Sequence, residues 1–163
     1  MKVELTAERL REVLEYSPES GQFIWLISSS PNCKPGQVAG TTTARGYRQI
    51  RVDGTTYLAH RLAWLHATGA WPQEHIDHIN GITADNRLVN LRDVSRFVNA
   101  QNARRASRNS KSGILGVSPL GKRWVAKIRV DGADVFLGSF ATAEAAAEAY
   151  LSCKRQHHEG CTI

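Results

Sequence analysis

The sequence predicts an α+β protein that contains two small modules, and three observations support this prediction. Apolar residues alternate between helical and strand-like spacing along the 163 residues. Asp-Gly pairs at 53–54 and 131–132 punctuate the strand-like runs, as tight turns do. Residues 103–113 are basic, lack apolar periodicity and separate the two halves of the chain. A chain of this length suits one domain or two very small ones.

The elements of the N-terminal half follow from local signals. Leu5, Leu10 and Val13 have nearly helical spacing, and Pro18 ends the helix that they predict. Asp53-Gly54 supplies the positive φ angles of a two-residue hairpin turn. The expected elements are a helix over 5–15, a strand over 22–27, a loop over 28–40, hairpin strands over 47–52 and 55–58, and a helix over 60–67 that Gly69 closes.

The remaining expected elements lie before and after the basic segment 103–113. Ser95 can cap a helix, and Thr142 can start an alanine-rich one. The expected elements are strands near 75–79 and 91–94, a helix from Arg96 to about Arg105, strands near 114–118, 123–130 and 134–139, and a helix from Thr142 to about His157. We therefore expect a first module at 1–102 with its motif core at 60–102, a linker at 103–113 and a second module at 114–163.

Composition excludes several classes of protein. The chain is 42% hydrophobic and 22% charged, which excludes collagen-like, coiled-coil and wholly disordered proteins. No run approaches the roughly 18 apolar residues of a membrane-spanning helix, and the first residues lack the apolar segment of a signal peptide. We therefore expect a soluble, cytoplasmic protein with no membrane partner. Its three cysteines, Cys33, Cys153 and Cys161, should be free thiols.

The net charge of +6 is concentrated in one block of the sequence. Residues 101–130 carry eight basic side chains and no acidic one, whereas residues 61–100 carry four of each. Such a block is typical of a protein that binds a polyanion such as DNA. The alternative is a solvated basic surface that binds nothing.

Four polar residues in the middle of the chain have the spacing of a known catalytic motif. Asp77 and His78 are adjacent, Asn90 follows twelve residues after His78, and Asn99 follows nine residues later on the expected helix. With the flanking segments His60-Arg-Leu-Ala-Trp and Asn86-Arg-Leu-Val-Asn-Leu-Arg, this pattern resembles the HNH nucleases. The resemblance is to the phage and intron homing subgroup, in which Asn replaces the last His of the motif.

The resemblance implies a role for each of these residues. His78 would be the general base, since a neutral imidazole has an ordinary pKa of about 6.5. Asp77 and Asn99 would bind one Mg²⁺ or Mn²⁺ ion, because carboxylate and amide oxygens suit these metals. Asn90 would hold the loop and the orientation of the His78 ring. The implied fold is the beta-beta-alpha-metal (His-Me finger) module, a hairpin crossed by a helix.

Some alternatives remain open at this stage. Asp77, His78, Asn90 and Asn99 could be turn residues, caps or surface amides. Adjacent residues of a regular strand point to opposite faces, so Asp77 and His78 share one site only if the strand ends or twists there. His75 could touch the metal shell, and His60-Arg61 could serve in packing or in a phosphate contact, although a structural role is favoured for both histidines. A zinc site made of Cys153, His157, His158 and Cys161 is disfavoured, because one helical stretch cannot easily surround a tetrahedral ion.

The second module resembles a different family of DNA-binding domains. Gly116-Val-Ser-Pro-Leu-Gly-Lys-Arg-Trp and Phe136-Leu-Gly-Ser-Phe are similar to the Apetala-two class, which implies a three-stranded antiparallel sheet that packs on one helix and enters the major groove of DNA. Trp124 shares its strand face with Ile128, which favours a core position. The opposite face is basic. The residues expected to contact DNA are Arg61, Arg87, Arg104, Arg105, Arg108, Lys111, Lys122, Arg123, Lys127 and Arg129.

The sequence as a whole therefore predicts a metal-dependent endonuclease that hydrolyses phosphodiester bonds of double-stranded DNA. One metal site implies that one strand is nicked per active site, and the protein could be a monomer or a homodimer. If the gene belongs to a phage, the protein would act in the cytoplasm of a bacterial host. The alternative is a non-catalytic, sequence-specific DNA-binding regulator that retains the HNH fold.

Overall fold

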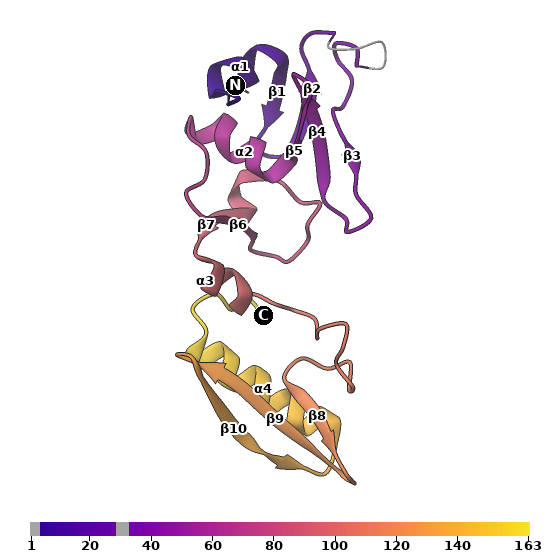
Figure 1. Cartoon of the computed structure of the whole chain (residues 1–163), viewed down its shortest axis with the longest axis vertical. Coiled ribbons are helices and arrows are strands. Elements are labelled where there is room, and N and C mark those ends of the chain that lie inside the picture. The colour runs from indigo at the N-terminus through magenta and orange to yellow at the C-terminus, as the bar shows by residue number, and fades with distance from the viewer. Residues whose placement is uncertain (1–3, 29–32) are drawn as a thin grey trace. The chain divides into compact units, whose positions relative to one another are not determined.

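The computed structural model describes residues 4–28 and 33–163 and divides the chain into two compact units, Met1–Ser95 and Arg96–Ile163 (Figure 1). Within these residues there are four α-helices and four small sheets, so the predicted α+β class is confirmed. The compact units divide after Ser95, whereas the sequence suggested a boundary near residue 102. The functional division at 1–102, 103–113 and 114–163 stays a prediction.

The first unit begins with a short helix followed by a hairpin. Helix α1 (Ala7–Val13) leads directly into β1 (Leu14–Ser17), which is antiparallel to β2 (Gln22–Trp25). The prediction that this helix reaches residue 15 is wrong. Leu14 and Tyr16 alternate with exposed or half-buried neighbours and are buried in the core, so pairing with β2 outweighs another turn of helix.

The start of α1 follows from its sequence. The hydroxyl of Thr6 accepts a hydrogen bond from the backbone N–H of Arg9 at 3.2 Å, which satisfies one of the unpaired donors at the helix start. The expected loop over 28–40 lies partly outside the described residues. In its described part, Val38 forms an isolated antiparallel bridge with Ile24.

A three-stranded antiparallel sheet follows, with strands β3 (Thr41–Thr42), β4 (Arg48–Val52) and β5 (Thr55–Leu58). The β4–β5 hairpin has the predicted turn, in which Asp53 and Gly54 have φ angles of 46° and 78°. Helix α2 (Ala59–Thr68) begins directly after β5. It ends at Gly69, which has a left-handed φ of 81°, as the sequence predicted.

The candidate motif lies on a second hairpin. Strand β6 (His75–His78) pairs antiparallel with β7 (Leu91–Val94), and the segment 79–90 joins them, ending in a 3-10 turn at Leu88–Asn90. Both strands were predicted. One buried residue of each strand, Ile76 and Leu91, joins the core that α1, β1, β2, β4 and α2 also supply, so this hairpin is fixed to the rest of its unit.

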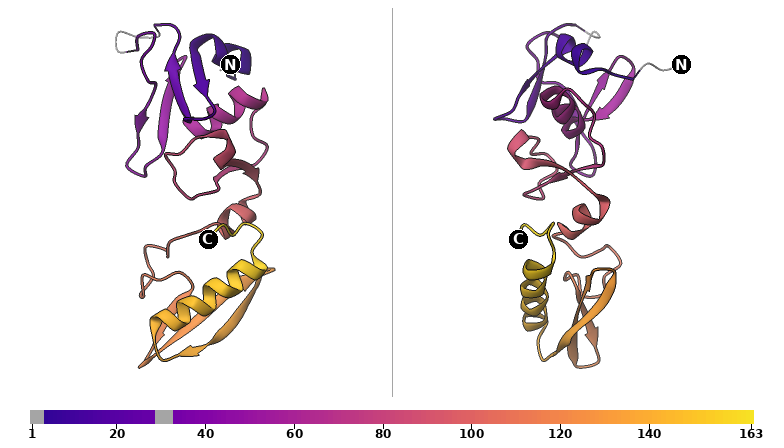
Figure 2. Two further views of the ribbon diagram at one scale, coloured as in Figure 1. Left: turned by 180° about the vertical axis from the view of Figure 1, so that it is seen from behind. Right: turned by 90° about the vertical axis from the view of Figure 1, so that its left-hand side faces the viewer.

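The second unit contains one three-stranded sheet and two helices. Helix α3 (Arg96–Gln101) comes first, and β8 (Val117–Leu120), β9 (Arg123–Val130) and β10 (Ala133–Phe140) form an antiparallel sheet in the order β10-β9-β8. Helix α4 (Ala143–His157) then covers one face of the sheet (Figure 2). Residue Trp124 packs against this core, which confirms its predicted inward position.

Two predicted boundaries in this unit are wrong. Strand β8 starts at Val117 rather than at residue 114. Helix α3 ends at Gln101 rather than near Arg105, because the next residues bond to the C-terminal segment. The hydroxyl of Thr162 donates to Asn102 Oδ1 at 2.6 Å, and the buried Lys154 donates from Nζ to the backbone carbonyl of Ala103. These bonds stabilise a non-helical path.

Two general expectations can be compared with the structure. Among the helices in the described ranges, none is both long and apolar enough to cross a membrane. Cys33, Cys153 and Cys161 all lie in the described part of the chain and are free thiols, as predicted.

Candidate active site

Asp77 and His78 end strand β6 and are both buried, with 6% and 5% of their surfaces exposed. Their side chains have different partners. Asp77 Oδ2 accepts hydrogen bonds from Arg92 Nε at 2.9 Å and Nη2 at 2.8 Å, and Arg92 lies directly opposite on β7. His78 Nε2 lies 3.2 Å from Asn86 Oδ1 in the connecting loop. The alternation of a strand therefore gives the two neighbours separate environments.

The environment of His78 favours the neutral imidazole. Burial lowers the pKa of His78 below its ordinary value of 6.5, because a charged ring loses its hydration. The hydrogen bond with Asn86 and the nearby carboxylates of Asp77 and Asp85 act in the opposite direction and offset only part of this effect. At neutral pH the ring therefore has a lone pair that can accept a proton.

Asn90 closes the loop between β6 and β7. Its Oδ1 accepts from the backbone N–H of Asn80 at 2.9 Å, and its Nδ2 donates to the carbonyl of Asp85 at 2.7 Å. The backbone of Asn90 also accepts from Ile79 N at 2.9 Å. Asn90 thus holds both ends of the loop together, while the hydrogen bond to the His78 ring comes from Asn86.

Asp85 stiffens the same loop through its carboxylate. It accepts from Arg87 Nε at 2.8 Å and Nη2 at 2.7 Å, and from Asn80 Nδ2 at 2.7 Å. The bond to Arg87 is the main reason that the pKa of Asp85 falls to about 2. Arg87, expected to contact DNA, is therefore already paired, with 47% of its side chain exposed.

The β1–β2 hairpin packs against the loop that joins β6 and β7. Tyr16 on β1 donates from its hydroxyl to the carbonyl of Asn86 at 2.8 Å, in a buried position. Leu88 N donates to the carbonyl of Pro18 at 3.2 Å. Gly21 has a φ of 70°, and a Cβ there would lie 2.5 Å from Arg87 N, so the loop backbone packs directly on this glycine. The partner of His78 is thus positioned by residues about 70 positions earlier.

Asn99 lies on α3, in the second unit, and is half-buried. Asp77 belongs to the first unit, so their joint binding of a metal ion stays a prediction. In residues 4–28 and 33–163, no group of three or more His, Cys, Asp or Glu side chains could hold a metal ion. The interpretation that Cys153, His157, His158 and Cys161 form no zinc site stays a prediction. A set of one carboxylate and one amide is not such a group, and its hard oxygen atoms suit Mg²⁺.

The two uncertain histidines differ in burial. His60 on α2 is 6% exposed, as expected for a structural residue. His75 at the start of β6 is exposed, and its structural role stays a prediction. His75 opens the strand opposite Val94, where the hairpin meets solvent.

The other basic residues expected to contact DNA are mostly exposed. Arg61 is half-buried, with its guanidinium 5.6 Å from the centre of the Trp71 ring. Arg104 donates to the carbonyl and hydroxyl of Thr162. Arg123 bonds to Ser139 across β9 and β10, and Arg129 bonds to Gly132. The side chains that are exposed are those of Arg104, Arg105, Arg108, Lys111, Lys122, Arg123, Lys127 and Arg129.

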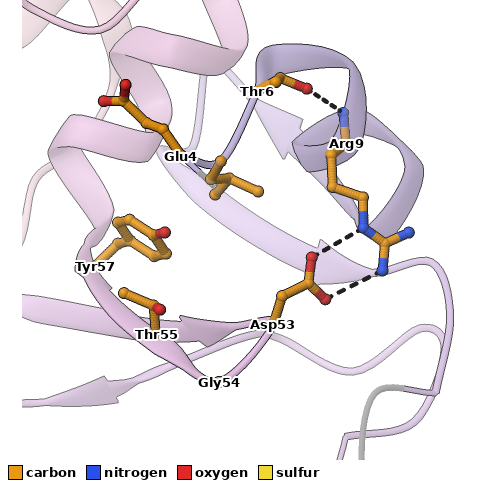
Figure 3. Close-up of a pocket in the computed structure, with 8 residues that line it drawn as sticks. Glu4, Thr6, Arg9, Asp53, Gly54, Thr55 and Tyr57 are labelled. Atoms are coloured by element: carbon orange, nitrogen blue, oxygen red, sulfur yellow. Dashed lines mark hydrogen bonds and ion pairs between the residues drawn. The ribbon is translucent and has the colours of Figure 1, made fainter. Parts of the chain in front are cut away.

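A separate pocket of about 440 Å³ lies near the N-terminus (Figure 3). Arg9 donates to both carboxylate oxygens of Asp53 at its edge, at 2.9 and 3.1 Å, and Tyr57 and Thr55 form another part of the wall. None of its lining residues is a predicted site residue, so the pocket has no part in the candidate active site.

Comparison with known families gives one match. Residues 57–101, which run from the end of β5 to the end of α3, match the family described as HNH endonuclease. The chain has no significant match among curated proteins or among solved structures. The family match supports an HNH endonuclease domain in this part of the chain, that is, a hydrolase that cleaves DNA.

Proposed function

We propose that the protein is a metal-dependent endonuclease that nicks one strand of double-stranded DNA per active site. The observation that carries the proposal is the position of His78. Its ring is buried and held by Asn86 at the end of β6, within the segment that matches the HNH endonucleases, and burial lowers its pKa. Such a ring is suited to remove a proton from an attacking water near neutral pH.

The hydrogen bond to Asn86 suggests which nitrogen is the base. When Nε2 carries the hydrogen and donates it to Asn86 Oδ1, the lone pair of the neutral ring lies on Nδ1. Nδ1 then accepts the proton of the water that attacks the phosphorus atom. Asn90 supports this arrangement indirectly, because it fixes the loop from which Asn86 projects.

Asp77 and Asn99 would hold the metal ion, with Mg²⁺ or Mn²⁺ as the candidates. A bound ion would stabilise the charge that develops on the leaving oxygen. The donor chemistry fits, since a carboxylate and an amide carbonyl both offer hard oxygen ligands of the kind that these ions prefer. The likeness to the phage and intron homing enzymes of the His-Asn-Asn type forms part of this proposal.

The C-terminal unit would supply most of the affinity for DNA. Its exposed basic side chains include Lys122 and Arg123 at the start of β9 and Lys127 and Arg129 farther along it. Arg123, Lys127 and Arg129 share one face of a sheet whose other face packs on α4, which is the arrangement of the Apetala-two-like domains. Phosphate contacts would come from these residues and from the basic segment 103–113.

A second function is favoured by the pairing of Asp77. Its carboxylate bonds to Arg92 and would have to accept a metal ion as an additional or alternative partner. A regulator that retains the HNH fold and binds DNA without cleaving it would need no such change. A single assay distinguishes the endonuclease from the regulator.

That assay is the conversion of supercoiled plasmid to open circles by the pure protein. We expect nicking with Mg²⁺ or Mn²⁺ and none with a chelator, and a slow second event should give linear DNA. Plasmid that is bound but stays supercoiled with every divalent ion would establish the regulator instead. A catalytic impurity is excluded by the His78→Ala variant purified in the same way.

A further inference from the structure

His78 is packed against the rings of two other residues. The ring of His60 on α2 lies 5.0 Å from that of His78, centre to centre, and the two planes make an angle of 84°. Tyr47, directly before β4, has its ring centre 5.5 Å from that of His60 and 6.1 Å from that of His78. Three rings from separate segments of the first unit therefore meet at the proposed general base.

His60 is an unusual residue for a core position. It is 6% exposed, and its Nδ1 is buried without a hydrogen-bond partner among the residues that the structure describes. The other buried residues of α2, such as Leu62, Ala63 and Leu65, are apolar. A buried nitrogen without a partner lowers stability, so packing alone favours an aliphatic side chain here.

Burial also keeps His60 neutral. Loss of hydration is the main reason that the pKa of His60 falls to about 4, and the nearby His78 and Arg61 lower it further. The ring that faces His78 is consequently an uncharged aromatic ring throughout the neutral range. Edge-to-face contact is one of the two arrangements that aromatic rings favour, and the angle of 84° between the two planes matches it.

We propose that His60 is a positioning residue, whose ring sets the plane of His78 through edge-to-face contact. The proposal rests on the proposed function, in which His78 is the base. Asn86 holds the ring of His78 at Nε2. Contact with the flat ring of His60 opposes rotation of the plane of His78, so that Nδ1 stays directed at one point.

Two substitutions separate a positioning ring from ordinary packing. His60→Leu is close in size and apolar, so it keeps the core filled but offers no flat ring. His60→Phe keeps a flat ring but is larger, so the tightly packed surroundings make it the less stable of the two. We expect kcat for plasmid nicking to fall about tenfold in His60→Leu and to stay within about threefold in His60→Phe, with KM for DNA unchanged in both.

The order of the two variants is the decisive result. His60→Leu should be the more stable of the two variants, whereas His60→Phe should have the higher kcat. If His60 had only a structural role, the more stable variant would also have the higher kcat. Equal kcat in the two variants, or a loss confined to KM, would overturn the proposal. Leu62→Ala serves as a control, since Leu62 is fully buried in the same helix roughly 200° from His60. It should lower the melting temperature and leave kcat unchanged below that temperature.

A measurement without cleavage separates this proposal from the proposed function. In NMR spectra of the full chain, the His78 ring protons should show a ring-current shift from His60 that persists in His60→Phe and is lost in His60→Leu. Unchanged His78 resonances in His60→Leu would contradict the positioning role even if the wild-type protein nicks DNA. A lost shift in a protein that does not nick would support the contact and contradict the endonuclease instead.

Discussion

At the scale of single residues, the side chains of Asp77 and His78 have different surroundings although the two residues are neighbours in sequence. Asp77 bonds to Arg92 across the hairpin, and His78 bonds to Asn86 in the loop. Because β6 ends at His78, the two side chains can still serve one site, as the proposed function requires. A carboxylate balanced by a cation and a neutral imidazole are two different chemical groups, as the two roles in phosphodiester hydrolysis require.

The buried histidine His60 makes a prediction about stability and pH. Its pKa of about 4 in the folded chain lies below the ordinary value of 6.5, so the unfolded chain binds more protons between these values. The free energy of unfolding should be fully retained above pH 6.5 and should decrease as pH falls towards 4, by on the order of 3 kcal/mol from this group.

Denaturant titrations at several pH values measure this effect. His66 and His78 also have lowered pKa values and contribute to the total slope, so the comparison needs a variant that removes His60 alone. His60→Leu should reduce the loss of stability between pH 6.5 and 4. The same loss in the variant and in the wild type would show that His60 is not buried in the neutral form.

At the scale of elements, the proposed base is held by one hairpin while another hairpin supports it. Strands β6 and β7 carry Asp77, His78 and Arg92. The β1–β2 hairpin fixes the loop that contains Asn86, through Tyr16, Pro18 and Gly21. The N-terminal region therefore belongs to the candidate site, although it lies outside the matched residues 57–101.

Gly21 offers a test of this support. An alanine Cβ would lie 2.5 Å from Arg87 N and 2.6 Å from the carbonyl carbon of Asn86, and both are backbone atoms that cannot move independently. Gly54 has a similar φ of 78° with open space around it. Gly54→Ala should cost about 1 kcal/mol of stability for its backbone conformation alone. Gly21→Ala should cost roughly 2 kcal/mol more and should also slow nicking.

Thermal unfolding and kcat of the two variants give the comparison. Because both glycines have left-handed backbone, their difference isolates the contact between Gly21 and the loop. Equal losses of stability would show that the loop adapts without cost and that the first hairpin does not position Asn86.

Local signals predicted most elements, and pairing between distant segments explains the failures. Asp53-Gly54, Gly69 and Thr142 act within a few residues, so the β4–β5 hairpin, the end of α2 and the start of α4 were predictable. Strand β1 was mistaken for helix because only its partner β2 makes it extended. Strand β3, with two residues, has no periodicity to detect.

The candidate site also has a part that was predictable and a part that was not. The spacing of Asp77, His78 and Asn90 in the sequence identified them as candidates, and these three residues lie within one hairpin. The contacts of His78 with Asn86, His60 and Tyr47 could not be predicted, since the last two come from segments 18 and 31 residues earlier. Asn86 was visible only as part of a flanking motif, and nothing in the sequence of Tyr16 or Gly21 connects them with His78.

At the scale of the whole molecule, basic charge is distributed unevenly along the chain. Residues 61–100 are balanced, whereas residues 101–130 are strongly basic, and this block contains β9 with its exposed Lys127. The proposed function therefore places the general base in the first unit and most phosphate contacts in the second. Binding to DNA should depend on salt through the second unit.

Replacing one lysine tests this division. Lys127→Gln should weaken binding to DNA of any sequence and reduce by about one the slope of log affinity against log salt, since each phosphate contact releases counterions. Arg51→Gln, which removes an exposed charge from β4 in the first unit, should leave the slope unchanged. Equal changes in the two variants would indicate that net charge, rather than the sheet face, attracts DNA.

Plasmid nicking by His78→Ala, measured together with DNA binding, tests most directly whether His78 is the base of a DNA endonuclease. We expect the variant to bind DNA almost as tightly as the wild type and to lose Mg²⁺-dependent conversion of supercoiled to open-circular plasmid by at least a hundredfold. Nicking by His78→Ala at the wild-type rate would contradict the assignment.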